Sequence, residues 1–198
     1  MGGDPHDHEL VRRSLSGDDR DAFGLLYLRY RDAVKKLAYW RLGNTHDADD
    51  ATQETFLKAF RQRHSYRATG SFKAWLLRIC ERVCSDRGRS AKPTLCLDCA
   101  DPDQHAGGVG TVDAAEWMTV RAAISKLPAQ EAVAWFLIAV LGCTSKEAAV
   151  IVNVRPGSTM RSRCCNAQKK LRRELAEDPT LTPADPEMAA VARFGASS

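Results

Sequence analysis

The stretch RPGSTMRSRCCNAQKKLRR, residues 155–173, decides the fold of the C-terminal half of this 198-residue chain. It contains seven Lys or Arg residues and no Asp or Glu. Its apolar and small side chains recur with the period of a helix, at Met160, Cys164, Ala167 and Leu171. A second short helix is predicted just before it, at residues 145–152, with a turn between the two. Two short helices joined by a turn, the second one basic, indicate a helix-turn-helix that binds DNA.

Helical periodicity extends over most of the remaining chain, and no segment alternates in the manner of a strand. Gly, Asn and Pro residues mark the ends of these segments, and Ser71 and Pro128 are suited to helix starts. The predicted helices span residues 8–15, 22–42, 47–63, 71–87, 112–126 and 129–141. The sequence therefore predicts an all-α fold.

Two segments of the chain break the helical pattern. Residues 90–112 contain two prolines and three glycines, so no helix is expected there. Residues 178–198 hold three prolines and several acids, and we expect them, like residues 1–7, to be mostly disordered. Two small helical domains joined by a flexible acidic linker are therefore predicted. The expected boundaries are 8–90 for the first domain, 91–112 for the linker, 113–177 for the second domain and 178–198 for the tail.

Charge is unevenly distributed along the chain, although the formal net charge is only +4. Residues 61–92 hold nine Lys or Arg and two acids, whereas residues 44–56 hold four acids and no Lys or Arg. Residues 93–120 carry five acids and also lack Lys and Arg. Two basic blocks separated by an acidic stretch suggest two modules that face nucleic acid.

The composition disfavours several classes of protein. No apolar run approaches the roughly 18 residues of a membrane-spanning helix, so no membrane insertion is expected, and residues 1–10 lack the apolar core of a signal peptide. Seven cysteines, an odd number at uneven spacing, favour a reducing cytoplasm over a disulfide framework. The chain has no glycine-rich phosphate loop and no nucleophile–base constellation, so we expect neither an enzyme nor a cofactor.

Cys96 and Cys99 form a CxxC pair inside the expected linker. They are weak metal candidates, because a zinc site needs about four ligands. His105 is the nearest additional ligand in the sequence, and Cys80 and Cys84 are remote options. Two further cysteines are expected to be small core residues, Cys143 and Cys164. A thiol- or zinc-responsive regulator is therefore an alternative interpretation.

Two more stretches carry a resemblance to a known family. In DADDATQETFLKAF, residues 47–60, an acid-rich start precedes Gln-Glu and then Phe-Leu, and SFKAWLLRI, residues 71–79, has the pattern Ser-Phe-x-x-Trp-Leu-x-x-Ile. Together with the helix-turn-helix, this order resembles the extracytoplasmic-function (ECF) sigma factors of the sigma-70 family. These are minimal bacterial initiation factors with only domains 2 and 4. The resemblance covers residues 23–89 and 119–175, and it implies core RNA polymerase and promoter DNA as partners, with an anti-sigma protein as a further candidate.

The resemblance implies that the helix in residues 47–60 docks on the coiled coil of the largest polymerase subunit. Acidic side chains at the start of an exposed helix suit a basic partner surface. The implied polymerase-binding residues are Asp47, Asp49, Asp50, Gln53, Glu54, Phe56 and Leu57. For Asp47, helix capping is an equal alternative. Gln53 and Glu54 lie beyond the first turn, where capping acids act, so polymerase contact is favoured for both.

The segment after this helix is implied to capture the non-template strand of the −10 element, with one base flipped into a pocket. Such capture needs cations for phosphates and aromatic or planar groups for bases. The implied −10 residues are Arg61, Arg63, His64, Tyr66, Arg67, Lys73, Trp75 and Arg78. We expect Phe72 to be a core residue, whereas Trp75 suits either role. A solvated face is the alternative for the arginines.

Residues 159–163 resemble the start of the helix with which the family reads the −35 element. Burial of the stripe at residues 160–171 leaves the other face for the major groove, where Arg pairs well with guanine and Asn with adenine. The start of the helix is expected to bind phosphate. The implied −35 residues are Ser158, Thr159, Arg161, Ser162, Arg163, Cys165, Asn166 and Lys169. Lys169 and the basic residues after it are expected either to contact phosphates or to form a solvated face, and the two alternatives are equal. Asn153 takes the place of a turn glycine, and Asn tolerates the left-handed conformation.

The leading hypothesis is a cytoplasmic sigma factor that binds core RNA polymerase and directs it to promoters by reading −35 duplex and melted −10 DNA. The alternative from another class is a stand-alone helix-turn-helix regulator. That alternative explains the basic helix at residues 155–173, but it leaves the acidic segment at residues 47–60 without a role.

Overall fold

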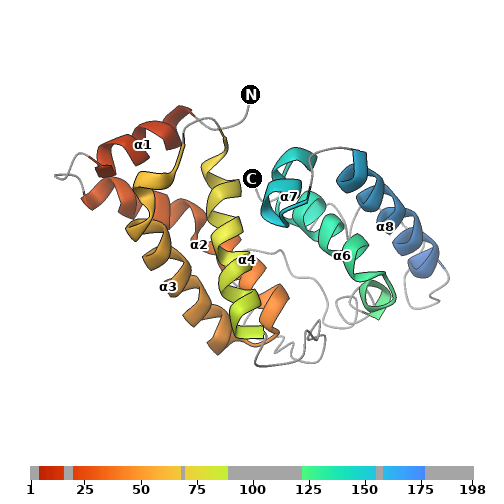
Figure 1. Ribbon diagram of the computed structural model, residues 1–198. Coiled ribbons are helices and arrows are strands. Elements are labelled where there is room, and N and C mark those ends of the chain that lie inside the picture. Colours follow the sequence, from red (N-terminus) through yellow and green to blue (C-terminus); the bar gives the residue numbers. More distant parts are fainter. Residues whose placement is uncertain (1–4, 16–19, 68–69, 89–121, 155–157, 177–198) are drawn as a thin grey trace. The chain divides into compact units, whose positions relative to one another are not determined.

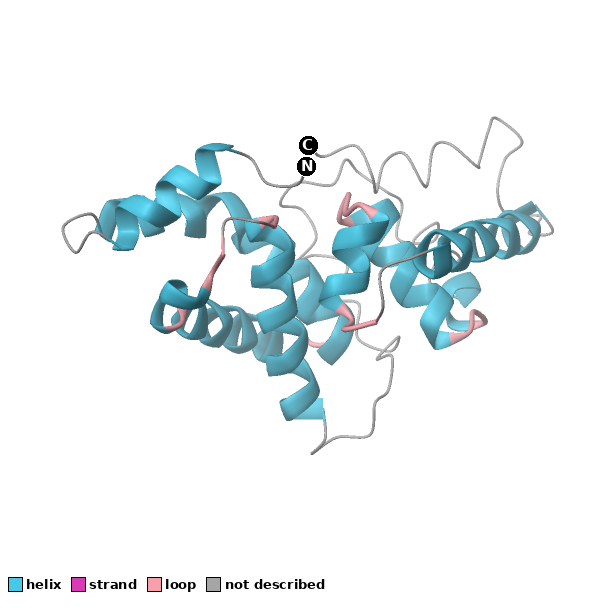
Figure 2. Cartoon of the chain, turned by 45° about the horizontal axis from the view of Figure 1, so that its top comes forward, coloured by secondary structure: helices cyan, strands magenta, loops and turns pink. Residues whose placement is uncertain are grey.

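The computed structural model describes residues 5–15, 20–67, 70–88, 122–154 and 158–176 (Figure 1). Within these residues the secondary structure is helical, and no strand occurs (Figure 2). This confirms the predicted all-α class. The chain forms two compact units, which are described one at a time below.

The N-terminal unit is a bundle of three long helices with a shorter helix packed on it (Figure 1). Its elements are α1 at Pro5–Leu15, α2 at Arg20–Leu42, α3 at Thr45–Arg61, the short 3-10 helix η1 at Arg63–Ser65, and α4 at Phe72–Gly88. Helices α2, α3 and α4 pack pairwise against one another, and α1 packs on α2. The largest fully buried side chains of this unit are Leu10, Leu26, Val34, Leu37, Phe72, Leu76, Leu77 and Val83.

Caps explain where α3 and α4 begin. Gly43 adopts a φ of 80°, and its N–H donates to the Tyr39 carbonyl at 2.8 Å, which ends α2. The side chain of Asn44 then accepts a hydrogen bond from the N–H of Asp47 at 2.8 Å and caps α3. The hydroxyl oxygen of Ser71 accepts a hydrogen bond from the Ala74 N–H at 3.4 Å, as predicted for a serine that caps α4.

Several predicted helix boundaries in this unit differ from those of the structure, and α2 begins two residues early, at Arg20. Helix α3 begins two residues before the predicted start and ends at Arg61, because Asn44 caps it and the chain tightens into η1 at Arg63. Helix α1 begins at Pro5, three residues before the predicted start and inside the stretch expected to be disordered. Proline suits the first turn of a helix because its missing N–H has no intrahelical acceptor there.

The C-terminal unit contains one long helix, α8, and several shorter helices (Figure 1). Residues 122–125 are helical and are followed by α6 at Ala129–Trp135, a π-helical turn η3 at Phe136–Val140, α7 at Ser145–Ile151 and α8 at Ser158–Ala176. Helices α6 and α8 pack against each other. We predicted one regular helix over residues 129–141. The wider turn appears where three consecutive bulky residues, at 135–137, are all buried, a pattern that one regular helical stripe does not provide.

Helix α8 has the predicted register. The stripe of apolar and small residues is buried, with exposed fractions of 1% for Met160, 5% for Cys164, 0% for Ala167 and 3% for Leu171. The turn before α8 also behaves as expected, because Asn153 has a φ of 57°, the left-handed conformation that its place in the turn predicts.

The predicted linker and tail, together with Cys96, Cys99 and His105, lie outside the described residues. None of the described helices is both long and apolar enough to cross a membrane.

Candidate functional site

One face of α3 presents carboxylates around an exposed apolar side chain. Asp47, Asp50 and Gln53 are exposed, and Asp49 and Glu54 are half-buried. Within the same turns, the side chain of Leu57 is 57% exposed. These residues come from successive turns of one helix, so the fold brings six of the seven implied polymerase-binding side chains to its surface.

Phe56 is the exception in this set, because only 5% of it is exposed. Its ring packs edge-on against Tyr27 at a centroid distance of 4.7 Å and against Phe23 at 6.5 Å. The side chain therefore joins α3 to α2 within the core. It packs the helix that carries Leu57 against α2, and almost none of its own surface is exposed.

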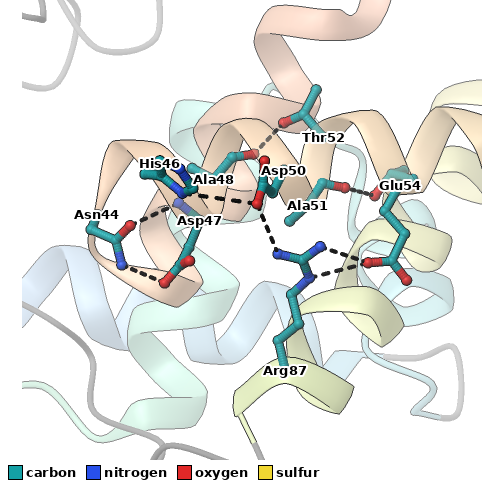
Figure 3. Close-up of polar contacts among 10 residues, drawn as sticks. Asn44, His46, Asp47, Ala48, Asp50, Ala51, Thr52, Glu54 and Arg87 are labelled. Atoms are coloured by element: carbon teal, nitrogen blue, oxygen red, sulfur yellow. Dashed lines mark hydrogen bonds and ion pairs between the residues drawn. The ribbon is translucent and has the colours of Figure 1, made fainter.

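Asp49, Asp50 and Glu54 have basic partners within the same unit, and Figure 3 shows Arg87 beside Asp50 and Glu54. Arg87, on α4, contacts Oε2 of Glu54 through Nη2 at 2.8 Å and Nε at 3.1 Å, and its Nη1 lies 4.0 Å from Asp50. Lys58 contacts the other oxygen of Glu54 at 2.7 Å, and Lys35 contacts Asp49 at 2.7 Å. Lys58 and Arg87 together hold the pKa of Glu54 below its usual range.

Asp47 takes part in capping the start of α3 and is also exposed at the surface. Its carboxylate accepts a hydrogen bond from Nδ2 of Asn44 at 2.7 Å, while its N–H donates to Oδ1 of the same residue (Figure 3). This reciprocal pair fits the capping interpretation. Because Asp47 is also exposed, the pair leaves room for a contact with a partner.

The segment after α3 gathers aromatic rings beside basic residues. Tyr66 lies 5.4 Å from Trp75 and 5.4 Å from Phe72, measured between ring centroids. Phe72 is fully buried, as expected of a core residue, whereas Tyr66 and Trp75 are half-buried. Burial, followed by the charge of Asp7, raises the pKa of Tyr66 to about 12. The result is a partly exposed aromatic pair on a buried ring.

The basic residues implied in −10 binding differ in their surroundings. Arg61, His64 and Arg67 are exposed, and Lys73 and Arg78 are half-buried. Arg63 is engaged inside the unit. It donates to the carbonyls of Phe60 at 2.7 Å and Ser14 at 3.2 Å, and its guanidinium lies 4.0 Å above the Phe60 ring. Those contacts attach Arg63 to α1 and to the last turn of α3.

The face of α8 opposite the buried stripe is exposed. The exposed members of the implied −35 set are Thr159, Arg161, Ser162, Cys165, Asn166 and Lys169. Arg163 is half-buried, and Ser158 is the first residue of the helix. Lys170 lies on the other side, where its ammonium contacts Glu131 of α6 at 2.8 Å. Lys170 therefore joins α8 to α6, whereas the exposed members of the −35 set lie on the face of α8 opposite its buried stripe and point outward.

The buried cysteines do not form a metal centre in the described part of the chain. Cys80 and Cys84 lie on one face of α4 with their sulfurs 4.0 Å apart, and Cys143 and Cys164 are core residues, as expected. Among the described residues, no group of three potential ligands is close enough to hold a metal ion. Desolvation raises the pKa of the Cys164 thiol, which disfavours the thiolate.

Sequence reasoning missed three residues near these surfaces: Arg87, Asp7 and His8. Arg87 reaches α3 from the far end of α4, and the other two reach later segments from α1. Each contact joins positions more than 20 residues apart, so helical spacing carries no signal for it. The one sequence pattern that suggests Arg87 is an acidic residue within one predicted helix followed by a basic residue at the end of the next helix.

Comparison with known proteins identifies the family. The model for sigma-70 region 2 matches residues 26–94. The ECF RNA polymerase sigma factor SigM of Mycobacterium tuberculosis strain H37Rv is 33% identical over 171 residues, which cover 85% of this chain and 84% of SigM. This chain belongs to the ECF sigma factors. This sigma factor is thus a transcription initiation factor that binds core RNA polymerase and directs it to promoters, and the predicted sigma-factor function is confirmed.

Further relatives agree with this membership. SigW of Bacillus subtilis, also an ECF RNA polymerase sigma factor, is 30% identical over 178 residues, covering 83% of this sigma factor and 95% of SigW. Among solved structures, CnrH in complex with the cytosolic domain of CnrY has the same fold. Its TM-score is 0.66 at 24% identity, over 87% of this chain and 99% of CnrH.

Proposed function

We propose that this sigma factor divides promoter recognition between its two units. Residues 8–90 dock on core polymerase and read the melted −10 element, residues 113–177 read the −35 duplex, and residues 91–112 link them. The observation that carries this assignment is the register of α8, whose buried stripe leaves polar and basic side chains on one exposed face. Such a face suits the major groove.

The docking surface is proposed to be the exposed face of α3. Leu57 supplies the apolar contact, and the flanking carboxylates Asp50 and Glu54 supply charge that suits a basic partner surface. Asp47, Asp49 and Gln53 extend this surface. For Phe56 we propose a packing role, since its ring is buried between α2 and α3.

For the −10 element, we propose that Tyr66 and Trp75 receive bases and that the surrounding cations receive phosphates. The two rings lie 5.4 Å apart and are both half-buried, so each offers part of an aromatic face. The proposed phosphate contacts are Arg61, His64, Arg67, Lys73 and Arg78. Arg63 is proposed to position the segment, because carbonyls of the same unit occupy its guanidinium.

For the −35 element, the proposed base contacts are Arg161, Ser162, Cys165 and Asn166 on the exposed face of α8. Ser158 and Thr159, at the start of the helix, are proposed to bind phosphate through backbone N–H groups and hydroxyls. Arg163 and Lys169 complete the phosphate contacts. Lys170 is not included, because Glu131 occupies its ammonium.

We also propose that the protein acts in the cytoplasm without catalysis of its own, and that an anti-sigma protein regulates it. The last point is supported by a structure of the same fold, the sigma factor RpoE of Bartonella quintana, which was solved in complex with the anti-sigma factor NepR. Its TM-score against this chain is 0.58 at 24% identity. Capture of a single protein from the native host that releases core polymerase from this chain would support regulation of that kind.

The assignment is tested by transcription in vitro with bacterial core RNA polymerase and promoters selected by the wild-type holoenzyme from a randomised library. Substitutions on α8 are expected to alter selection only at −35 positions, and substitutions at Tyr66 and Trp75 only at −10 positions. A mixed pattern, in which changes on α8 alter −10 selection, would overturn the division of roles between the two units.

A further inference from the structure

Helix α1 contacts the segment proposed to capture −10 DNA at two places. Nε of Arg63 donates to the carbonyl of Ser14, near the end of α1, at 3.2 Å. Farther along the segment, the ring of His8 stacks on the ring of Tyr66, with a centroid distance of 5.8 Å and an interplanar angle of 14°. Nδ1 of His8 also lies 3.0 Å from the Tyr66 hydroxyl oxygen. Helix α1 therefore holds the first part of this segment at two points, Arg63 and Tyr66.

Helix α1 is itself fixed on the bundle next to His8. Asp7 is only 2% exposed, and its carboxylate accepts hydrogen bonds from Nη1 of Arg29 at 2.5 Å and from the hydroxyl of Tyr30. Leu10, one turn later, is fully buried. A buried carboxylate with two partners on α2 fixes the rotation of α1, because any other rotation would leave its charge without a partner. His8 is thereby aimed at Tyr66.

Only one assignment of donors and acceptors satisfies both hydrogen bonds of the Tyr66 hydroxyl. The Tyr66 hydroxyl lies 2.7 Å from the carbonyl oxygen of Gly70, which can only accept, so the hydroxyl donates its single proton there. Its oxygen then accepts from Nδ1–H of His8. The raised pKa of Tyr66, about 12, keeps this hydroxyl protonated at neutral pH. A continuous relay of two hydrogen bonds thus joins α1 to Gly70 through Tyr66.

We propose that His8 is a positioning residue for −10 recognition: by donating to the Tyr66 hydroxyl, it fixes the Tyr66 ring beside Trp75, with the hydroxyl held on the Gly70 carbonyl, before DNA arrives. This inference rests on the proposed role of Tyr66 and Trp75 in base capture. Helix α1 thereby acts on the melted strand through Tyr66. Preorganisation of this kind increases capture because the segment loses less conformational freedom when DNA binds.

Three substitutions separate the hydrogen-bond relay from the fold. Tyr66→Phe keeps the ring and its packing and removes only the hydroxyl. His8→Ala removes the donor and the stacked ring, whereas His8→Asn restores an N–H donor near the position of Nδ1. Glu9→Gln is the matched control, because Glu9 is on the same helix and pairs only with Arg12 among the contacts seen for its carboxylate.

The test is open-complex formation by holoenzyme made with full-length chains and bacterial core polymerase, followed by 2-aminopurine fluorescence in the −10 element of a selected promoter. We expect His8→Ala and Tyr66→Phe to lower the rate about tenfold, the effect typical of one lost hydrogen bond with a partly buried partner. His8→Asn should return to within about threefold of wild type, and Glu9→Gln should equal it. Affinity for core polymerase and for −35 duplex should be unchanged in all four.

Several results would overturn the proposal. A wild-type rate for Tyr66→Phe shows that the hydroxyl positions nothing, and His8→Asn as slow as His8→Ala shows that the donor is not what matters. A fall in polymerase affinity parallel to the fall in rate assigns His8 a role in folding alone. If Trp75→Ala also forms open complexes at the wild-type rate, the proposed −10 site itself fails, whereas a slow Trp75→Ala beside a normal Tyr66→Phe rejects the relay alone.

Discussion

Arg87, near the end of α4, makes two contacts with one carboxylate oxygen of Glu54, at 2.8 and 3.1 Å (Figure 3). The same guanidinium approaches Asp50 at 4.0 Å. The charge on the proposed docking face of α3 is therefore partly neutralised within the protein before polymerase is present. A basic partner surface must compete with Arg87 for these two carboxylates.

This competition predicts that Arg87→Ala tightens binding to core polymerase. Exposed ion pairs contribute up to about 1 kcal/mol, so loss of the Arg87 contacts, with Lys58 still paired to Glu54, is expected to raise affinity about two- to fivefold at low salt. The gain should disappear at high ionic strength. Titration of labelled chain with core polymerase at two salt concentrations measures both effects. Arg82→Ala, on an exposed position of the same helix, is the control for the change in net charge.

The neighbours Phe56 and Leu57 predict opposite outcomes for two similar substitutions. Phe56→Ala removes a buried ring between α2 and α3 and is expected to cost about 3–5 kcal/mol of unfolding free energy. Leu57→Ala alters a side chain that is 57% exposed, so stability should change by less than about 0.5 kcal/mol while polymerase affinity falls. Denaturant unfolding and polymerase titration separate the two. A strongly destabilised Leu57→Ala would contradict the burial seen here.

Residues 47–60 and 155–173 show which features a sequence can predict. The stripe of α8 and the left-handed turn at Asn153 were predicted correctly, because helical period and backbone preference are local properties. The family pattern assigns Phe56 to the docking surface, but its burial depends on rings of α2, and this contact between separate helices is not visible in the sequence. The pairing of Arg87 with Glu54 joins two helices at positions 33 residues apart, so periodicity along either helix does not predict it.

The pH dependence of stability follows from Glu81, which pairs with Arg41 at 2.8 Å. Burial raises the pKa of Glu81 above 4.5, against the opposing effect of Arg41. The folded state therefore binds this proton more tightly than the unfolded state does. The resulting stabilisation is present below pH 4.5 and is lost as pH rises through the raised pKa. Glu81→Gln should remove this decline in thermal unfolding measured from pH 4.5 to 7; an unchanged decline would assign it to another group.

Asn166 and Lys169 are both exposed on α8, and the proposed −35 contacts predict different effects for them. Asn166→Ala should cost about 1–3 kcal/mol at one base pair and relax selection there, because a bidentate amide is lost from a base edge. Lys169→Ala should weaken binding to all sequences and reduce the slope of log affinity against log salt by about 1, because one phosphate contact is lost. Lys170→Ala is the control, since Glu131 occupies that ammonium, and its DNA binding should be unchanged. Promoter selection and salt titration with each holoenzyme distinguish these outcomes. Uniform weakening by Asn166→Ala would place that side chain on phosphate and move the base-reading face of α8 by one position.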